Sequence, residues 1–159
     1  DIRSGWIPTT SRQIEYPIAI SPDEPVITPL MLIGHASRLV RDGQESSSEH
    51  LVFTDTQLYR VTLELAPEQK IAAKFTLAEG TRNTQVNERR SARRVSINAQ
   101  LLGEEAENDD FSLLELSGEL AIYIDVQTGI PLRIQGSATG LGAVPVAISK
   151  AVLEPECAR

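Results

Sequence analysis

The sequence contains very little of the chemistry that marks many catalytic and binding sites. One cysteine, one methionine and two histidines occur in 159 residues, and only 4% of the residues are aromatic. The single cysteine, Cys157, excludes an internal disulfide and argues against a thiolate metal site. Scarce aromatic rings argue against a surface that stacks nucleic-acid bases. Apolar runs stay below the roughly 20 residues of a membrane-spanning helix, so we expect no transmembrane segment.

Charge and length narrow the class of protein further. The formal net charge is -7, and a field of this sign repels nucleic acid and anionic lipid headgroups unless a local patch overrides it. The apolar fraction of 41% is ordinary for a globular chain, and the length fits one domain. We therefore expect a single globular domain with no nucleic-acid partner and no cofactor.

The start of the chain bears on its compartment. The only methionine is Met31, so we expect that a chain beginning at Asp1 has lost its initiator. Removal of a signal peptide would have this effect, as would trimming. We expect a periplasmic or otherwise extracytoplasmic location.

Prolines divide the chain into three parts. Five of the nine lie in the first thirty residues: Pro8, Pro17, Pro22, Pro25 and Pro29. This spacing is too close for a helix and predicts an extended arm. The predicted organisation is an arm over residues 1–29, an antiparallel β domain over 30–154 and a tail over 155–159.

Apolar residues recur at every second position from Leu30 onward, which predicts strands with one buried face. The expected strands lie in "QLYRVTLEL", "IAAKFTLA", "RRVSINAQLL", "FSLLELSGELAIYIDV", "IPLRIQGSA" and "AVPVAISKAVL". The first two are predicted to pair through a hairpin at "APEQK", and the long fourth one to bend at Gly118. Residues 27–40 are predicted as a strand, because Pro29 and Gly34 interrupt the helical alternative. Seven or eight strands would form an antiparallel meander that curls into a barrel or half-open barrel.

Three motifs invite a catalytic or ligand-binding interpretation that their spacing does not support. "GSATGLG" lacks the Lys-Ser/Thr of a phosphate loop and the glycine spacing of a dinucleotide fingerprint, which favours a hairpin connection. "SSSEH" lacks the surroundings of a catalytic serine. "DVQTG" separates Asp125 from Thr128, unlike the contiguous motif of aspartic proteases. Asp125 and Thr128 instead suit an Asx-type turn in which Gly129 supplies a positive φ.

Two charged clusters also have plain interpretations. His35 and His50 are predicted to lie at opposite ends of a hairpin formed by residues 31–41 and 49–54, so we expect no metal site. "RNTQVNERRSARR" precedes the acidic run "GEEAENDD". Without interleaved aromatic residues, the basic run is predicted to be a solvated loop that the neighbouring acids balance.

"IDVQTGIPLRIQG", followed by "GLGAVPVAI", resembles the terminal hairpins of bacterial envelope proteins that have a lipoprotein-carrier-like half barrel. The resemblance covers residues 120–153. It implies a curved antiparallel sheet whose concave face shelters an acyl chain or the hydrophobic segment of a partner. Carriers of this kind close the barrel with helices, and no good helical candidate is evident in this sequence.

The leading hypothesis is a non-enzymatic envelope domain that binds a lipid or another hydrophobic ligand on the concave face of the sheet. The residues expected to line that face are Tyr59, Val61, Leu63, Phe75, Leu77, Val95, Ile97, Leu114, Leu116, Leu120, Ile122 and Ile124. Ordinary core packing explains the same residues equally well. The alternative is a protein-interaction module that contacts another envelope protein through a sheet edge or the N-terminal arm.

Overall fold

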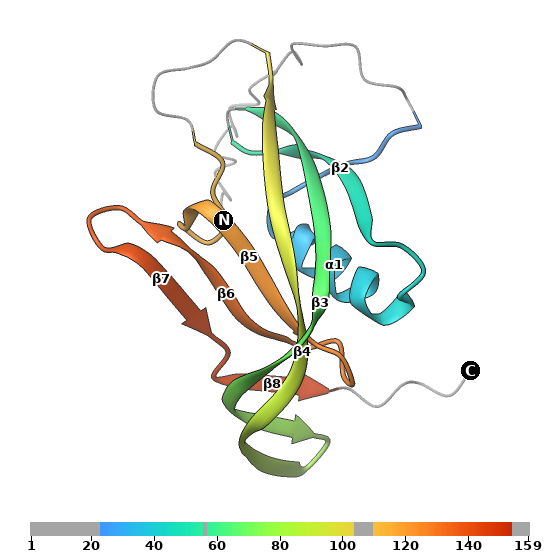
Figure 1. Cartoon of the computed structure of the whole chain (residues 1–159), viewed down its shortest axis with the longest axis vertical. Helices are drawn as coiled ribbons and strands as arrows, with labels where there is room; N and C mark the ends of the chain where they lie inside the picture. The colour runs from blue at the N-terminus through green and yellow to red at the C-terminus, as the bar shows by residue number, and fades with distance from the viewer. Residues whose placement is uncertain (1–22, 56, 104–109, 154–159) are drawn as a thin grey trace, which may run out of the picture.

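The computed structural model describes residues 23–55, 57–103 and 110–153, which form one sheet and one helix (Figure 1). The elements are β1 (Val26–Ile27), α1 (Met31–Asp42), β2 (Ser47–Phe53), β3 (Leu58–Glu79), β4 (Arg82–Leu102), β5 (Ser117–Asp125), β6 (Pro131–Ala138), β7 (Gly142–Ala147) and β8 (Lys150–Leu153). Strands β1 to β7 follow one another in the sheet, and β8 pairs with the far end of β3. The prediction of a mainly β protein with seven or eight strands in one antiparallel sheet is confirmed: the sheet has eight strands, is mostly antiparallel and does not close into a barrel. Residues 1–22 of the predicted arm and the whole predicted tail lie outside the described residues, and the end of the arm contains β1.

The strand predicted over residues 27–40 is wrong, because most of this segment is the helix α1. Its buried residues, Leu32, Ala36, Leu39 and Val40, recur at helical spacing and form one apolar stripe. Pro29 precedes the helix, where its missing N–H costs no intrahelical hydrogen bond, and its carbonyl accepts a hydrogen bond from the backbone N–H of Leu32. Gly43 ends the helix in the left-handed conformation with φ 59°. Within the described residues, the structure has no helix with the length and hydrophobicity that a membrane crossing requires.

β3 and β4 form one long hairpin that turns at Gly80. The hairpin predicted at "APEQK" is wrong, because these residues lie within β3, where the pairing with β4 shifts between Leu65 and Glu68. This bulge accommodates Pro67, which cannot donate a backbone hydrogen bond. The loop predicted for residues 82–94 is wrong for the same reason, since these residues continue β4 as the partner of β3.

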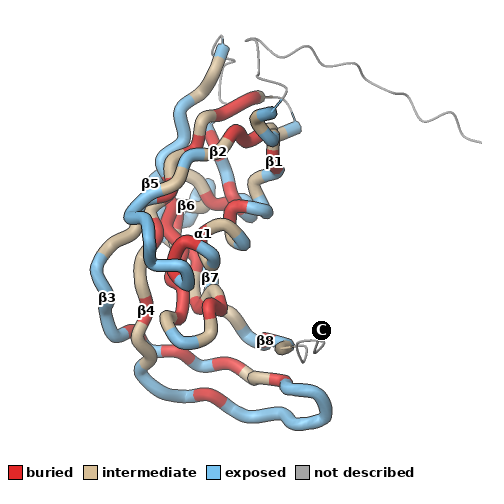
Figure 2. Tube along the Cα trace, turned by 90° about the vertical axis from the view of Figure 1, so that its right-hand side faces the viewer, coloured by how far each residue is buried: buried red, intermediate tan, exposed pale blue. Residues whose placement is uncertain are grey.

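The bulge reverses which face of β3 is apolar. One extra residue on β3 moves all later side chains to the opposite face. Odd-numbered residues therefore point to one side before the bulge, as Tyr59 and Val61 do, and to the other side after it, as Ile71 and Phe75 do. Residues 68–79 of β3 and 82–93 of β4 form an arm in which buried and exposed residues alternate (Figure 2).

Two separate hydrophobic cores follow from this reversal. The first lies between α1 and the sheet, and α1 contacts β3 and β5 there. Its buried residues are Ile27, Leu32, Ala36, Leu39, Val40, Val52, Tyr59, Val61, Leu63, Val95, Ile97, Phe111, Leu113, Leu116, Leu120, Ile122, Ile124 and Ile134. The second joins the arm to β5, β6 and β8 through Ile71, Ala73, Phe75, Val86, Ala92, Ala121, Tyr123, Ile130, Leu132 and Ala151.

The long strand predicted from "FSLLELSGELAIYIDV" is also shorter than expected. Leu113 and Leu116 bond to each other through both backbone groups and close a tight turn. Leu114 and Glu115 take positive φ values of 52° and 64° in this turn, which lets both flanking leucines reach the first core. β5 then begins at Ser117, and the predicted bend at Gly118 is confirmed by a register shift there.

The predicted turn over 125–129 is confirmed and has an additional partner. Gly129 has φ 72° and donates its backbone N–H to the Asp125 carbonyl. The Asp125 carboxylate accepts hydrogen bonds from the Thr128 backbone and hydroxyl. It also accepts two from Arg90, from Nε and Nη2, each at 3.0 Å. Burial alone would raise the pKa of the Asp125 carboxyl, but these hydrogen bonds outweigh it and hold the pKa below its ordinary value.

Candidate functional site

The twelve residues expected to line a ligand face do not share one surface. Nine of them lie in the first core: Tyr59, Val61, Leu63, Val95, Ile97, Leu116, Leu120, Ile122 and Ile124. The apolar stripe of α1 packs into the same core and fills the space in which a ligand was expected. Phe75 and Leu77 pack in the second core because they follow the bulge, and Leu114 is 52% exposed on its turn. The cavities described next are lined by other residues.

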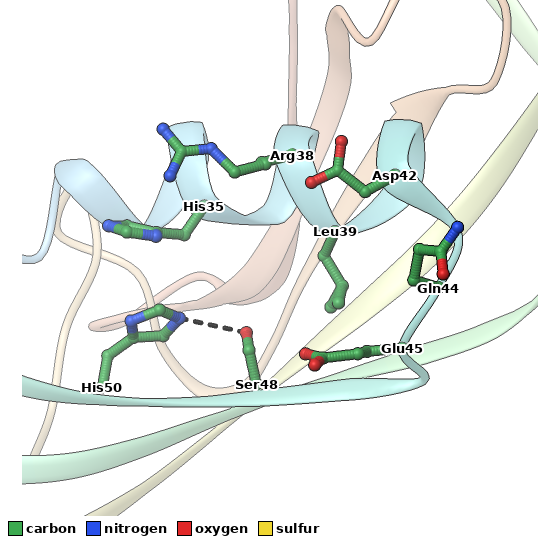
Figure 3. Close-up of a pocket in the computed structure, with 8 residues that line it drawn as sticks. All are labelled: His35, Arg38, Leu39, Asp42, Gln44, Glu45, Ser48 and His50. Carbon is green, nitrogen blue, oxygen red and sulfur yellow. Dashed lines mark hydrogen bonds between the residues drawn. The ribbon is translucent and has the colours of Figure 1, made fainter.

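A groove between α1 and β2, which we call the histidine groove, has a volume of about 370 Å³ (Figure 3). It is lined by His35, Arg38, Leu39, Asp42, Gln44, Glu45, Ser48 and His50. Helical spacing places His35, Arg38 and Asp42 on one side of α1, while Ser48 and His50 share a face of β2. Buried Leu39 lies between the two walls.

The two histidines meet across this groove. The ring centroids of His35 and His50 lie 4.2 Å apart with a 45° tilt, and Nε2 of His50 is 3.0 Å from the Ser48 hydroxyl. Burial lowers the pKa of His35, and nearby Arg38 lowers it further. Burial likewise lowers the pKa of His50, with a further contribution from His35. Both shifts favour the neutral form of the imidazole, which can donate one hydrogen bond and accept another.

The prediction that the histidines lie at opposite ends of a hairpin is wrong, because it assumed that residues 31–41 form a strand. The contact resembles stacking more than chelation. Two imidazoles on one tetrahedral ion hold their centroids about 5 Å apart, given the usual metal–nitrogen distance. The described residues contain no group of three or more side chains that could hold a metal ion. The pair is better suited to hydrogen bonding than to metal binding.

Charge is divided along the groove. His35, Arg38 and His50 lie at one end, and Gln44 and Glu45 lie at the other (Figure 3). Asp42 follows Arg38 by one helical turn, toward the acidic end. Among the described residues, none of these charged groups forms an ion pair. The groove therefore has one basic and one acidic end.

A second cavity of about 490 Å³ lies beside the histidine groove. Gly34, Ser37 and Arg41 of α1 line it together with Thr128 and Gly129 of the β5–β6 turn. Arg38 and Asp42 line both cavities, so the exposed side of α1 is flanked by hollows on two sides.

Comparison with known proteins finds no matching family model, no matching curated protein and no matching solved structure. The resemblance of residues 120–153 to carrier-like envelope proteins stays a prediction.

A serine beside a histidine raises the question of nucleophilic catalysis. Such a relay needs an acid that orients the histidine and donors that stabilise an oxyanion. In the described part of the chain, no carboxylate contacts either imidazole, and His50 packs against His35 instead. The described residues around this serine therefore lack the orienting acid of such a relay.

Sequence reasoning considered both histidines but missed the site. The signal that could have found it is the spacing of Leu32, Ala36, Leu39 and Val40. That spacing turns the segment into a helix and brings His35 toward β2.

Proposed function

We propose that this chain is a non-enzymatic binding domain that holds a small dipolar molecule in the histidine groove. The observation that carries the proposal is the division of charge between Arg38 at one end and Glu45 at the other, with Asp42 between them. Charged groups that have no ionic partner among the described residues are available to a ligand. A ligand with a negative and a positive end would satisfy both sets at once.

The size and lining of the groove support this proposal. A volume of about 370 Å³ falls within the usual range of small-molecule sites. Leu39 supplies an apolar surface between the charged ends, and the neutral imidazoles supply a donor and an acceptor. Seven of the eight lining residues are polar or charged, so the groove is more polar than most small-molecule sites and suits a charged ligand better than an apolar one.

The hydrophobic-ligand hypothesis is less well supported by the same geometry. A lipid could reach Tyr59, Ile122 or Ile124 only if α1 left the sheet, which would expose its own buried stripe. That hypothesis stays a prediction, but the groove needs no such rearrangement.

The sheet-edge alternative meets an obstacle at β7. The hydrogen bond from the Ile148 N–H to the Leu132 carbonyl fixes which residues of β7 point toward β6. By alternation, Pro145 points its backbone away from β6, toward the open edge. Its missing N–H interrupts the row of donors that an added strand would need.

Isothermal titration calorimetry can test the groove with amino acids and dipeptides. Each compound is compared with its N-acetylated, C-amidated form, which keeps the same side chains but has no terminal charges. We expect the charged form of at least one compound to bind, and its capped form to bind at least about tenfold more weakly, because each end loses a charge-assisted hydrogen bond. Arg38→Gln and Glu45→Gln should each weaken binding by a similar factor.

Arg41→Gln is the matched control, because Arg41 lies on the same helix but lines only the second cavity. It should leave the affinity unchanged. Equal binding of charged and capped compounds, or an equal effect of all three variants, would contradict the proposal.

A further inference from the structure

The chain has three lysines, and all three lie on one side of the arm. They are Lys70 and Lys74 on β3 and Lys150 on β8, and all are exposed. Lys150 pairs in register with Thr76, two residues from Lys74 along the same side of β3. Arg89 of β4 pairs with Ala72, between the two β3 lysines, and is also exposed. We call the surface formed by Lys70, Lys74, Arg89 and Lys150 the lysine face.

The lysine face is the side of the arm that the second core leaves uncovered. The alternate residues of the same strands, such as Ile71, Phe75 and Ala151, point to the other side and are buried in that core. The remaining described residues of the lysine side, taken from the strand registers, are Glu68, Ala72, Thr76, Ala78, Asn83, Gln85, Asn87, Ser91, Arg93 and Val152. Within this described set, Glu68 at the base of the arm is the only acid.

Contacts among the described residues do not neutralise this charge. In the described residues, neither the lysines nor Arg89 forms an ion pair. Arg89 donates Nη2 to the Lys70 carbonyl at 2.9 Å, which fixes its position but leaves its charge. The chain has a net charge of -7, yet it gathers these cations, which have no ionic partner among the described residues, on one face. A function of this face would explain such a local excess of positive charge.

We propose that the lysine face docks on the surface of an anionic lipid bilayer. Cations spread over three adjacent strands match a layer of diffuse negative charge better than they match a single phosphate. Lysine is a flexible point charge and does not make the bidentate contacts by which arginine recognises one anion. Val152, 64% exposed beside Lys150, adds an apolar contact at the level of the headgroups.

Nucleic acid fits this face less well, because no aromatic side chain lies among its described residues to stack on bases. The histidine groove contributes none of these residues, so the docking surface and the ligand site can be tested separately.

Vesicle flotation tests the proposal with the full chain. Phosphatidylcholine vesicles with and without phosphatidylglycerol are compared in low salt. We expect binding only to the vesicles that contain phosphatidylglycerol, and loss of that binding in high salt as the charges are screened. Each cation near such a surface contributes about fivefold to the partition coefficient, so Lys70→Gln/Lys74→Gln should weaken binding about 25-fold.

Arg41→Gln/Arg60→Gln is the matched control, because it removes two positive charges from α1 and from β3 ahead of the bulge. It should bind within about twofold of the unmodified chain. Far-UV circular dichroism should show the same spectrum for all three proteins, because the lysines are exposed. Absence of binding to the anionic vesicles, or an equal loss in both double variants, would overturn the proposal. Binding of a short DNA duplex through the same lysines, with no vesicle binding, would also overturn it.

Discussion

Removal of the Asp125 carboxylate tests which ion pair holds the β5–β6 turn in place. Arg90 contacts two carboxylates, that of Asp125 at 3.0 Å and that of Glu88 at 2.8 Å. The Asp125 side chain is 1% exposed, whereas that of Glu88 is 60% exposed. By distance alone the two pairs would be equivalent. Burial predicts that they are not.

Asp125→Ala should lower the free energy of unfolding by about 3–5 kcal/mol. Among the described residues, the variant leaves the Arg90 guanidinium, whose side chain is 15% exposed, with the exposed Glu88 carboxylate as its one ionic partner, and it deprives the Thr128 backbone N–H of its acceptor. Glu88→Ala should cost at most about 1 kcal/mol, because water replaces an exposed carboxylate readily. The shorter distance of the Glu88 pair does not offset its exposure.

Urea unfolding followed by far-UV circular dichroism measures the free energy of unfolding of both variants. The two free energies can be compared if the m-value is unchanged. In a double-mutant cycle, Asp125→Ala and Arg90→Ala should couple by about 1–3 kcal/mol, and Glu88→Ala should couple with Arg90→Ala by less. A loss for Asp125→Ala no larger than that for Glu88→Ala would refute the assignment of the turn to this buried pair.

Three further predictions concern backbone conformation, pH and the sheet edge. Gly129→Val should destabilise the fold by about 1–3 kcal/mol, since φ is 72° and a Cβ would lie 2.6 Å from the Arg41 Cδ. Gly34→Ala should instead stabilise α1 by about 0.5–1 kcal/mol in thermal melts, because a Cβ at this position would meet no neighbour. The folded-state pKa values of His35 and His50 lie below the unfolded value of 6.5, so the unfolded chain binds more protons than the folded chain below that pH. The free energy of unfolding should therefore fall as the pH drops through 6.5. Urea titrations of His35→Gln/His50→Gln should show a flatter profile in that window. Pro145→Val should restore a donor to the open edge of β7 and promote concentration-dependent association, visible by size-exclusion chromatography.

Strand alternation predicted most of the fold because most of the chain has period two. The strands at Tyr59 to Leu65, Val95 to Leu101 and Pro131 to Ala138 all follow it. The β6–β7 hairpin, which closes near Gly142, followed from the same reasoning. Local turn chemistry was equally informative, since Asp125 and Gly129 act as the sequence indicated.

Proline and glycine, which usually interrupt helices and strands, led to wrong predictions where their position in the element mattered more than their residue type. Pro29 and Gly34 argued against a helix, yet Pro29 precedes α1 and Gly34 lies where it meets no neighbour. Pro67 suggested a turn, yet it lies in a bulge inside β3. In each case the packing of the apolar residues around the proline or glycine decided the local structure. The propensity of a single residue type takes no account of such packing.

The Arg90–Asp125 pair could not be predicted because it depends on register. These residues lie 35 positions apart, and they meet only because Ala92 of β4 pairs with Asp125 of β5. The histidine pair depends on tertiary packing in the same way, since His35 reaches His50 only once α1 lies beside β2.

The bulge between Leu65 and Glu68 connects the two proposals physically. Before it, the apolar residues of β3 pack toward α1, whose other side forms the histidine groove. After it, the apolar residues turn to the second core, which leaves Lys70 and Lys74 facing outward. Without the extra residue, the same sequence would bury those lysines and expose Ile71 and Phe75. One inserted residue therefore allows a single sheet to present a charged groove at one end and a basic face at the other.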